Sequence, residues 1–152
     1  MAAKPRATNH PPGDAWLAEC SGHERLVHEV WSVGGLAPIH CTHWLAVEAQ
    51  LVAALEARKR IPMKARGPML LDSGLDVAWW LVPLDAADEL ADVRPLTVHP
   101  YDWPLHCPSP QRPACGRFWL DAPDGSGRLT DPAYLAAAFG PAASSLRAEA
   151  FG

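Results

Sequence analysis

The side chains best suited to bind a metal in this sequence are its seven histidines and four cysteines. Cys41 and His43 would share one face of a strand, and Cys107 and Cys115 flank a proline-rich loop. No C-x-x-C pair with a nearby His-x3-5-His is present, although structural zinc sites normally show such pairs. Buried thiols and ordinary imidazoles are therefore favoured, and a zinc site using some of these residues remains the alternative.

The cations able to hold phosphate are concentrated in one short stretch, which contains Arg58, Lys59, Arg60, Lys64 and Arg66. Closely spaced cations are typical either of a helix C-terminus, where they complement the macrodipole, or of a nucleic-acid-binding patch. The formal charge of −4, from 13 basic and 17 acidic side chains, excludes a surface that attracts nucleic acid everywhere. A local patch at these five residues stays open, and they are the candidate nucleic-acid-binding site.

Catalytic motifs are absent from the sequence. It contains no G-x-S-x-G elbow, and the loop over 121–127 lacks the lysine of a P-loop and the acid spacing of a calcium loop. Asp72 and Asp76 border a hairpin turn and are explained as turn formers. The sequence therefore assigns no catalytic residue, no metal ligand and no cofactor, and it favours a protein that is not an enzyme.

The order of secondary structure is the most informative feature of the middle of the chain. Alternation and helical periodicity predict strand, helix, strand, strand, helix and strand over 39–47, 48–60, 67–71, 76–84, 85–91 and 93–99. This order predicts an α+β fold with a ferredoxin/RRM-like βαββαβ core.

Further elements surround this core. We expect an N-terminal helix, or a broken helix, from a cap at Asp14 to a stop near Gly34, with Gly22 interrupting it. An extra β-hairpin is expected from strands over 103–107 and 116–120, and a C-terminal helix follows the polar cap at Thr130-Asp131. The domain organisation is then a flexible arm over 1–13, one α+β domain over 14–141 and a C-terminal tail over 142–152.

Trp79 and Trp80 lie in the third predicted strand, between Asp76 and Leu84. Both faces of this strand are apolar, which is typical of a central strand covered on each side. We therefore expect the two tryptophans to be core residues and not a platform for stacked bases, which would need an uncovered face.

The N-terminus has basic residues but no apolar region of the kind that export signals contain. The longest apolar run, over 77–82, is too short to cross a bilayer. A cytoplasmic protein with no membrane contact is expected, and its cysteines should stay reduced.

Several short motifs resemble those of one known family over about two thirds of the chain. They are Arg66-Gly67-Pro68-Met69-Leu70-Leu71-Asp72, Ala78-Trp79-Trp80-Leu81-Val82-Pro83, Leu105-His106-Cys107-Pro108, Phe118-Trp119-Leu120-Asp121-Ala122-Pro123-Asp124-Gly125 and, last, Leu129-Thr130-Asp131-Pro132. Together with the order of elements, they resemble short actinobacterial proteins related to the bifunctional DNA primase/polymerase N-terminal domain. That family carries a D-x-x-D or D-x-D metal-binding pattern on its first core strand, whereas His43 to Val47 here contains no acid.

The resemblance implies an RRM-like core and a link to DNA replication or a mobile element, without the catalytic metal site. The first functional hypothesis is a non-catalytic module that binds nucleic acid or a replication partner. The alternative is a small protein-interaction or regulatory module without nucleic acid, in which zinc could stabilise the fold. The sequence does not fix the oligomeric state.

Overall fold

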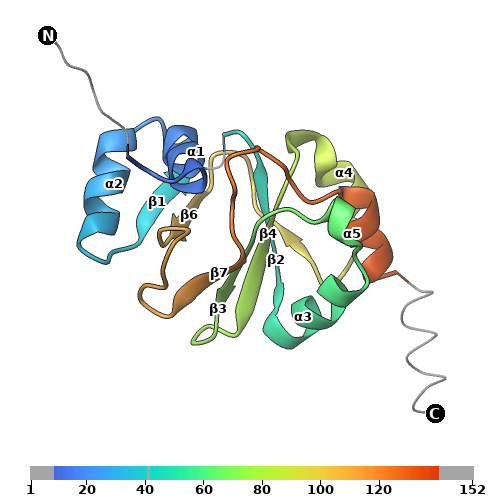
Figure 1. The fold of residues 1–152 in the computed structure, drawn as a ribbon. Coiled ribbons are helices and arrows are strands. Elements are labelled where there is room, and N and C mark those ends of the chain that lie inside the picture. Colours follow the sequence, from blue (N-terminus) through green and yellow to red (C-terminus); the bar gives the residue numbers. More distant parts are fainter. Residues whose placement is uncertain (1–8, 41, 141–152) are drawn as a thin grey trace, which may run out of the picture.

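The computed structural model describes residues 9–40 and 42–140 of the chain. Its centre is an antiparallel sheet of five strands in the order β5-β2-β4-β3-β7 (Figure 1). The strands are β2 (Leu45–Gln50), β3 (Met69–Asp72), β4 (Val77–Val82), β5 (Thr97–Val98) and β7 (Arg117–Asp121). The α+β class that the sequence predicts is confirmed.

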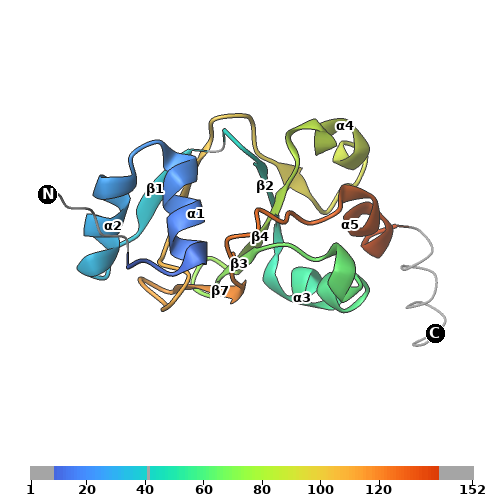
Figure 2. The ribbon, with the colours of Figure 1, turned by 45° about the horizontal axis from the view of Figure 1, so that its top comes forward.

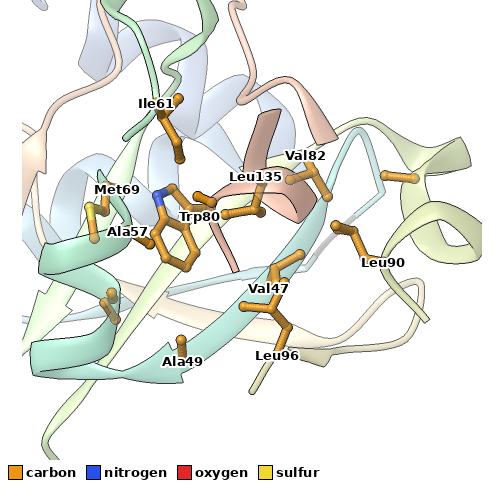
Figure 3. Close-up of a cluster of buried hydrophobic side chains, with 14 of the residues drawn as sticks. Val47, Ala49, Ala57, Ile61, Met69, Trp80, Val82, Leu90, Leu96 and Leu135 are labelled. Atoms are coloured by element: carbon orange, nitrogen blue, oxygen red, sulfur yellow. The ribbon is translucent and has the colours of Figure 1, made fainter. Parts of the chain in front are cut away.

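Helices cover one face of this sheet, on the right in Figure 1. They are α3 (Leu51–Lys59), α4 (Ala87–Leu90) and α5 (Pro132–Ala138), together with the short 3-10 turns η1 (Met63–Ala65) and η2 (Leu84–Ala86). Trp80 is the largest side chain beneath them, and Figure 3 shows it among Ala57, Ile61, Met69 and Leu135. Burial of these apolar side chains supplies the main drive for this half of the fold.

A second layer covers the opposite face of the sheet (Figure 2). It consists of α1 (Pro12–Ser21), α2 (Glu24–Ser32) and a two-stranded sheet of β1 (Ala37–His40) and β6 (Pro104–Cys107). Its core brings Leu17, Trp31, Ile39 and Leu105 against Trp79. Both faces of the central sheet are therefore covered by protein.

The alternation along β4 follows directly from this double covering. Trp79 and Leu81 lie in the core beneath the N-terminal layer, while Trp80 and Val82 lie in the core beneath the helices α3 to α5. Trp79 is 3% exposed and Trp80 is 2% exposed. The prediction that these tryptophans are core residues of a central strand is confirmed.

The N-terminal helix is broken at Gly22, as the sequence suggests, because this residue adopts a left-handed conformation with φ of 74°. The expected cap at Asp14 is wrong. The helix begins at Pro12, since proline is favoured in the first turn, where its missing N–H costs nothing. Asp14 instead accepts hydrogen bonds from Ser109 Oγ (2.9 Å) and Gln111 Nε2 (3.1 Å), which tie α1 to the loop after β6.

The boundary between β2 and α3 also differs from the expectation. Glu48 begins no helix: it is paired with Trp79 in the β2–β4 ladder, and Gln50 ends the strand. Gln50 Oε1 then accepts a hydrogen bond from the Ala53 backbone N–H at 3.0 Å, which fixes the helix start at Leu51.

The expected hairpin of β6 and β7 is wrong, because the two strands belong to different sheets. β6 pairs with β1, and β7 pairs with β3. The proline-rich connection crosses between the layers, and Trp119 Nε1 donates to its Pro108 carbonyl at 3.0 Å.

The last core strand is shorter than expected, since only Thr97 and Val98 pair with β2. A turn closed by the Leu96 N–H and the Val93 carbonyl takes the preceding residues out of the ladder.

The C-terminal helix is confirmed as α5, and Asp131 caps it by accepting from the Ala133 N–H at 2.9 Å. Within 9–40 and 42–140 no helix has the length and apolar character needed to cross a membrane. The tail over 142–152 and the first eight residues of the arm lie outside the described residues.

Candidate functional site

The five cations singled out from the sequence lie on one continuous segment, from the last turn of α3 to the start of β3. Arg58 and Lys59 end α3, Arg60 is its C-cap, Lys64 lies in η1, and Arg66 follows η1. The helix C-terminus that the sequence indicated is therefore present, with two cations in its last turn where they complement the dipole.

Arg58 is held by a carboxylate from the edge strand β7. Its Nε donates to Asp121 Oδ2 and its Nη2 donates to Asp121 Oδ1, both at 2.7 Å. The two side chains are 27% and 25% exposed. The hydrogen bond to Asp121 is the main reason that the pKa of Arg58 is raised, against the smaller opposing effect of burial.

Arg66 is oriented by backbone carbonyls instead of a carboxylate. Its Nε donates to the Ile61 carbonyl at 2.8 Å and its Nη2 to the Arg58 carbonyl at 3.1 Å. These bonds satisfy carbonyl groups at the end of α3 and hold the guanidinium in place.

Arg58, Arg66 and Arg128 line one pocket of about 180 Å³. The three arginines come from α3, from the residue after η1 and from the loop before α5, so the pocket joins three separate segments. Asp121 and Asp124 also line it, and three cations against two anions leave a formal excess of one positive charge. The remaining wall is formed by Met63, Gly67, Pro68, Ala122 and Pro123.

The loop carrying Asp124 and Arg128 is fixed by its own hydrogen bonds. Asp124 Oδ1 accepts from the Ser126 hydroxyl (2.6 Å) and backbone N–H (2.9 Å), and these bonds hold the pKa of Asp124 below its usual range. On its other side this loop touches α1: a Cβ added to Gly13 would overlap the Pro123 carbonyl. The pocket wall is thus supported by the N-terminal layer.

Lys59, Arg60 and Lys64 do not line the pocket, although they lie on the same segment. Lys59 Nζ pairs with Glu56 Oε2 at 3.2 Å on the exposed side of α3. Lys64 Nζ lies 5.9 Å from the centre of the Tyr134 ring on α5. Arg60 is exposed.

Arg128 is the member of the pocket that sequence reasoning missed. It is a single cation in a Gly-rich loop, 62 residues after Arg66, and only the fold brings it to the cluster. Its side chain is exposed, so it is accessible from solvent.

This arrangement is suited to bind an anion with several oxygens. Guanidinium groups donate in a planar fork that matches phosphate and carboxylate geometry. Within the described residues, the hydrogen bonds of Arg58 and Arg66 use Nε and Nη2, which leaves both Nη1 groups as donors for a ligand.

The chain was compared with known protein families, curated proteins and solved structures. Neither a protein family, nor a curated protein, nor a solved structure matches the chain.

A second polar group of interest lies on β2. It contains Glu48, which comes directly after the end of the strand predicted over 39–47. Glu48 Oε1 accepts from Trp79 Nε1 at 3.0 Å and lies 2.9 Å from His99 Nε2. The His99 ring stacks on Trp103 with centroids 3.6 Å apart. The sequence pattern predicts a helix at Glu48, whereas the pairing of β2 with β4 places its side chain beside Trp79.

An apolar pocket of about 540 Å³ lies beside His99, between α4 and β5. Among the side chains that line it, His99 and Tyr101 carry the polar atoms. The others are Leu45, Leu84, Ala87, Leu90, Ala91, Leu96, Val98 and Pro100.

The hypothesis of a zinc site requires several metal-binding side chains close together. Among residues 9–40 and 42–140, no group of three or more His, Cys, Asp or Glu side chains is placed to hold a metal. Cys107 is buried and its Sγ donates to the Leu105 carbonyl at 3.5 Å, while Cys115 is exposed. Cys41 lies outside the described residues.

Proposed function

We propose that this protein is a non-catalytic, primase/polymerase-like module with an RRM-like core, and that it binds the phosphates of nucleic acid. The core strands β2, β3, β4 and β5 are joined through α3, a hairpin and α4, and they are arranged β5-β2-β4-β3. This order supports the ferredoxin/RRM-like assignment, and β7 is an addition at one edge.

The observation that carries the proposal is the convergence of Arg58, Arg66 and Arg128 on one pocket. The three arginines outnumber the two carboxylates of the lining, Asp121 and Asp124, so the pocket keeps a formal charge of +1 that attracts an anion. Lys59, Arg60 and Lys64 extend the positive charge along the chain beside the pocket. Cations in this arrangement suit a polyanionic backbone, whose binding depends mainly on phosphate neutralisation.

The location of the pocket also favours phosphate contact over base stacking. Trp79 and Trp80 are buried on opposite faces of the sheet, so neither sheet face is free to stack bases. We therefore propose that the protein contacts the phosphate backbone of the nucleic acid at the rim of the sheet, where α3, β3 and the loop before α5 meet.

A non-catalytic role is proposed because β2 carries a single acid in place of an acid pair. Glu48 is hydrogen-bonded to Trp79 and lies beside His99, and Gln50 occupies the position two residues further on. Paired carboxylates are what a nucleotidyl-transfer site needs to hold its metal ions. A cytoplasmic location is part of the same proposal.

The test is a fluorescence-anisotropy titration of single-stranded DNA, duplex DNA, primed-template DNA and RNA at low and at physiological salt. We expect saturable binding whose log Kd changes linearly with log salt concentration. Arg128→Ala should weaken binding about 3- to 10-fold at low salt and reduce the slope by about 0.7 to 0.9. Arg94→Ala is the matched control, since Arg94 is exposed in the loop before β5 and does not line the pocket.

No binding at low salt, or equal losses in Arg128→Ala and Arg94→Ala, would contradict the proposed function. The apolar pocket between α4 and β5 supports a second candidate, a module that binds a protein partner without nucleic acid. Substituting Ala87 by Trp would fill that pocket. Loss of a co-purifying protein partner in this variant, with nucleic-acid binding absent from the wild type, would favour the second candidate.

A further inference from the structure

We infer that Asp121 is an internal competitor for the phosphate ligand, so that it sets the affinity of the arginine pocket. This inference rests on the proposed function and names the residue that regulates the same site. Asp121 occupies the fork of Arg58 in the free protein, and a phosphate must displace it to use that fork.

The first observation is the geometry of the pair. The Nε and Nη2 atoms of Arg58 both donate to the Asp121 carboxylate at 2.7 Å. The Asp121 carboxylate occupies the Nε–Nη2 edge of Arg58, and a phosphate can make a bidentate contact with this edge only by displacing it. The two anions are therefore alternatives at one set of donors.

The second observation is a β-bulge that directs Asp121 to this place. Trp119 is opposite Leu70 in the β3–β7 ladder, but Asp121, two residues on, is opposite Met69, so the register shifts by one residue at Leu120. Trp119 lies in the core beneath the N-terminal layer, whereas Met69 lies in the core beneath α3. Regular alternation would place Trp119 and Asp121 on the same face. The bulge instead brings Asp121 to the face of α3, and bulges commonly re-aim a side chain in this way.

The third observation is that Asp121 lines the pocket and is partly exposed, so a ligand can reach it. Arg66 is held differently, because its partners are the Ile61 and Arg58 carbonyls and not an anion. Within the described residues, Arg58 is the arginine of this pocket that forms an ion pair with a carboxylate of the lining. Removing the charge of the Asp121 carboxylate should leave the Arg58 guanidinium available to a phosphate.

The experiment compares Asp121→Asn with Asp124→Asn, using a fluorescein-labelled single-stranded DNA oligonucleotide at low salt. Both substitutions remove one negative charge from the pocket lining, but Asp124 bonds to Ser126 and not to Arg58. We expect Asp121→Asn to tighten binding about tenfold and Asp124→Asn about twofold, because Asp121→Asn also frees the bidentate fork. The salt slope should rise by about 0.7 in Asp121→Asn, as one more phosphate is neutralised.

The double variant Arg58→Gln with Asp121→Asn provides a second readout. It removes both charges of the pair and leaves the net charge of the pocket as in the wild type. If Asp121 acts by occupying the fork of Arg58, adding Asp121→Asn to Arg58→Gln should tighten binding only about twofold, because no fork remains to be freed. Thermal unfolding of each variant shows that the folded protein is being titrated.

The outcomes separate the inference from the proposed function. Equal tightening in Asp121→Asn and Asp124→Asn, or a tightening of about tenfold when Asp121→Asn is added to Arg58→Gln, would overturn the inference while nucleic-acid binding stands. Absence of binding in the wild type and in both single variants would overturn the proposed function, and the inference with it.

Discussion

Trp79 and Trp80 are neighbours on β4, yet their side chains lie in two separate hydrophobic cores on opposite faces of the five-stranded sheet. The N-terminal layer of α1, α2, β1 and β6 covers the first, and the helices α3 to α5 cover the second. This arrangement accounts for the uniformly apolar sequence of β4. It also directs any recognition of a large ligand to the rim of the sheet.

Truncating Trp79 or Trp80 should reduce the stability of the fold by similar amounts. Trp79→Ala and Trp80→Ala are each expected to lower the free energy of unfolding by about 3–5 kcal/mol, because each leaves a large cavity in a closed core. Urea unfolding followed by circular dichroism measures the loss. Trp103→Ala is the control: Trp103 stacks on His99 but is only partly buried, so its loss should be smaller. A near-neutral Trp79→Ala would mean that the N-terminal layer does not cover the sheet in solution.

A glycine in the pocket wall should not tolerate a side chain. A Cβ on Gly67 would overlap the Thr130 backbone nitrogen, and the Gly67 N–H donates to Thr130 Oγ1 at 3.0 Å. Gly67→Ala should therefore cost about 1–3 kcal/mol or more, because the loop before α5 must move away from β3. A urea titration measures this loss.

Gly74→Ala is the matched control for that substitution. The nearest atom to an added Cβ at Gly74 is Asp72 Oδ1 at 3.5 Å, an ordinary contact. Its effect on the free energy of unfolding should lie within about 0.5 kcal/mol. Similar losses in Gly67→Ala and Gly74→Ala would mean that the close approach of Thr130 is not rigid.

The parts of the fold predicted from the sequence are those decided by local pattern. Apolar residues on both faces identified β4 as a central strand, and Gly22 marked the break between the first two helices. The polar cap at Asp131 likewise fixed the start of α5. In each case neighbouring residues contain the physical cause.

The parts that the sequence did not reveal depend on contacts between distant residues. Glu48 belongs to a strand because Trp79 pairs with it and donates to its carboxylate, 31 residues later in the chain. Arg128 and Asp121 join Arg58 only after β7 has added to the sheet edge with its bulge. A linear search for clustered cations could find Arg58, but it could not find the anion that pairs with it.

Acid should remove a stabilising contribution from Asp72, whose side chain is 9% exposed beside Arg117. Burial by itself raises the pKa of Asp72, but the hydrogen bonds from the Leu75 N–H (2.9 Å) and Arg117 Nε (2.8 Å) outweigh it, so the pKa lies below its ordinary value of 3.8. A carboxyl whose folded pKa is lowered stabilises the protein above pH 3.8, and this stability is lost as the pH falls through the lowered value.

Asp72→Asn should accordingly be less stable than the wild type by about 1–3 kcal/mol at pH 7. The difference should shrink below about pH 4, where the wild-type carboxyl takes up its proton. Urea midpoints measured from pH 7 to pH 2.5 test this, with the exposed Asp92→Asn as control. A difference that stays constant down to the lowest pH would show that the charge of Asp72 is not what stabilises the turn.

Mild acid should act at a second place, the contact of His28 on α2 with the N-terminal residue His10. The rings stack with centroids 3.4 Å apart. The pKa of His28 is lowered from 6.5, first by burial and then by repulsion from His10, while Asp14 and Glu24 oppose the shift. A histidine with a lowered folded pKa binds protons more readily when unfolded, so acidification favours unfolding from about pH 6.5 downward.

His28→Gln should flatten the dependence of the urea midpoint on pH between 7 and 5. The exposed His23→Gln should retain the wild-type dependence, and an unchanged slope in His28→Gln would place the acid-sensitive group elsewhere.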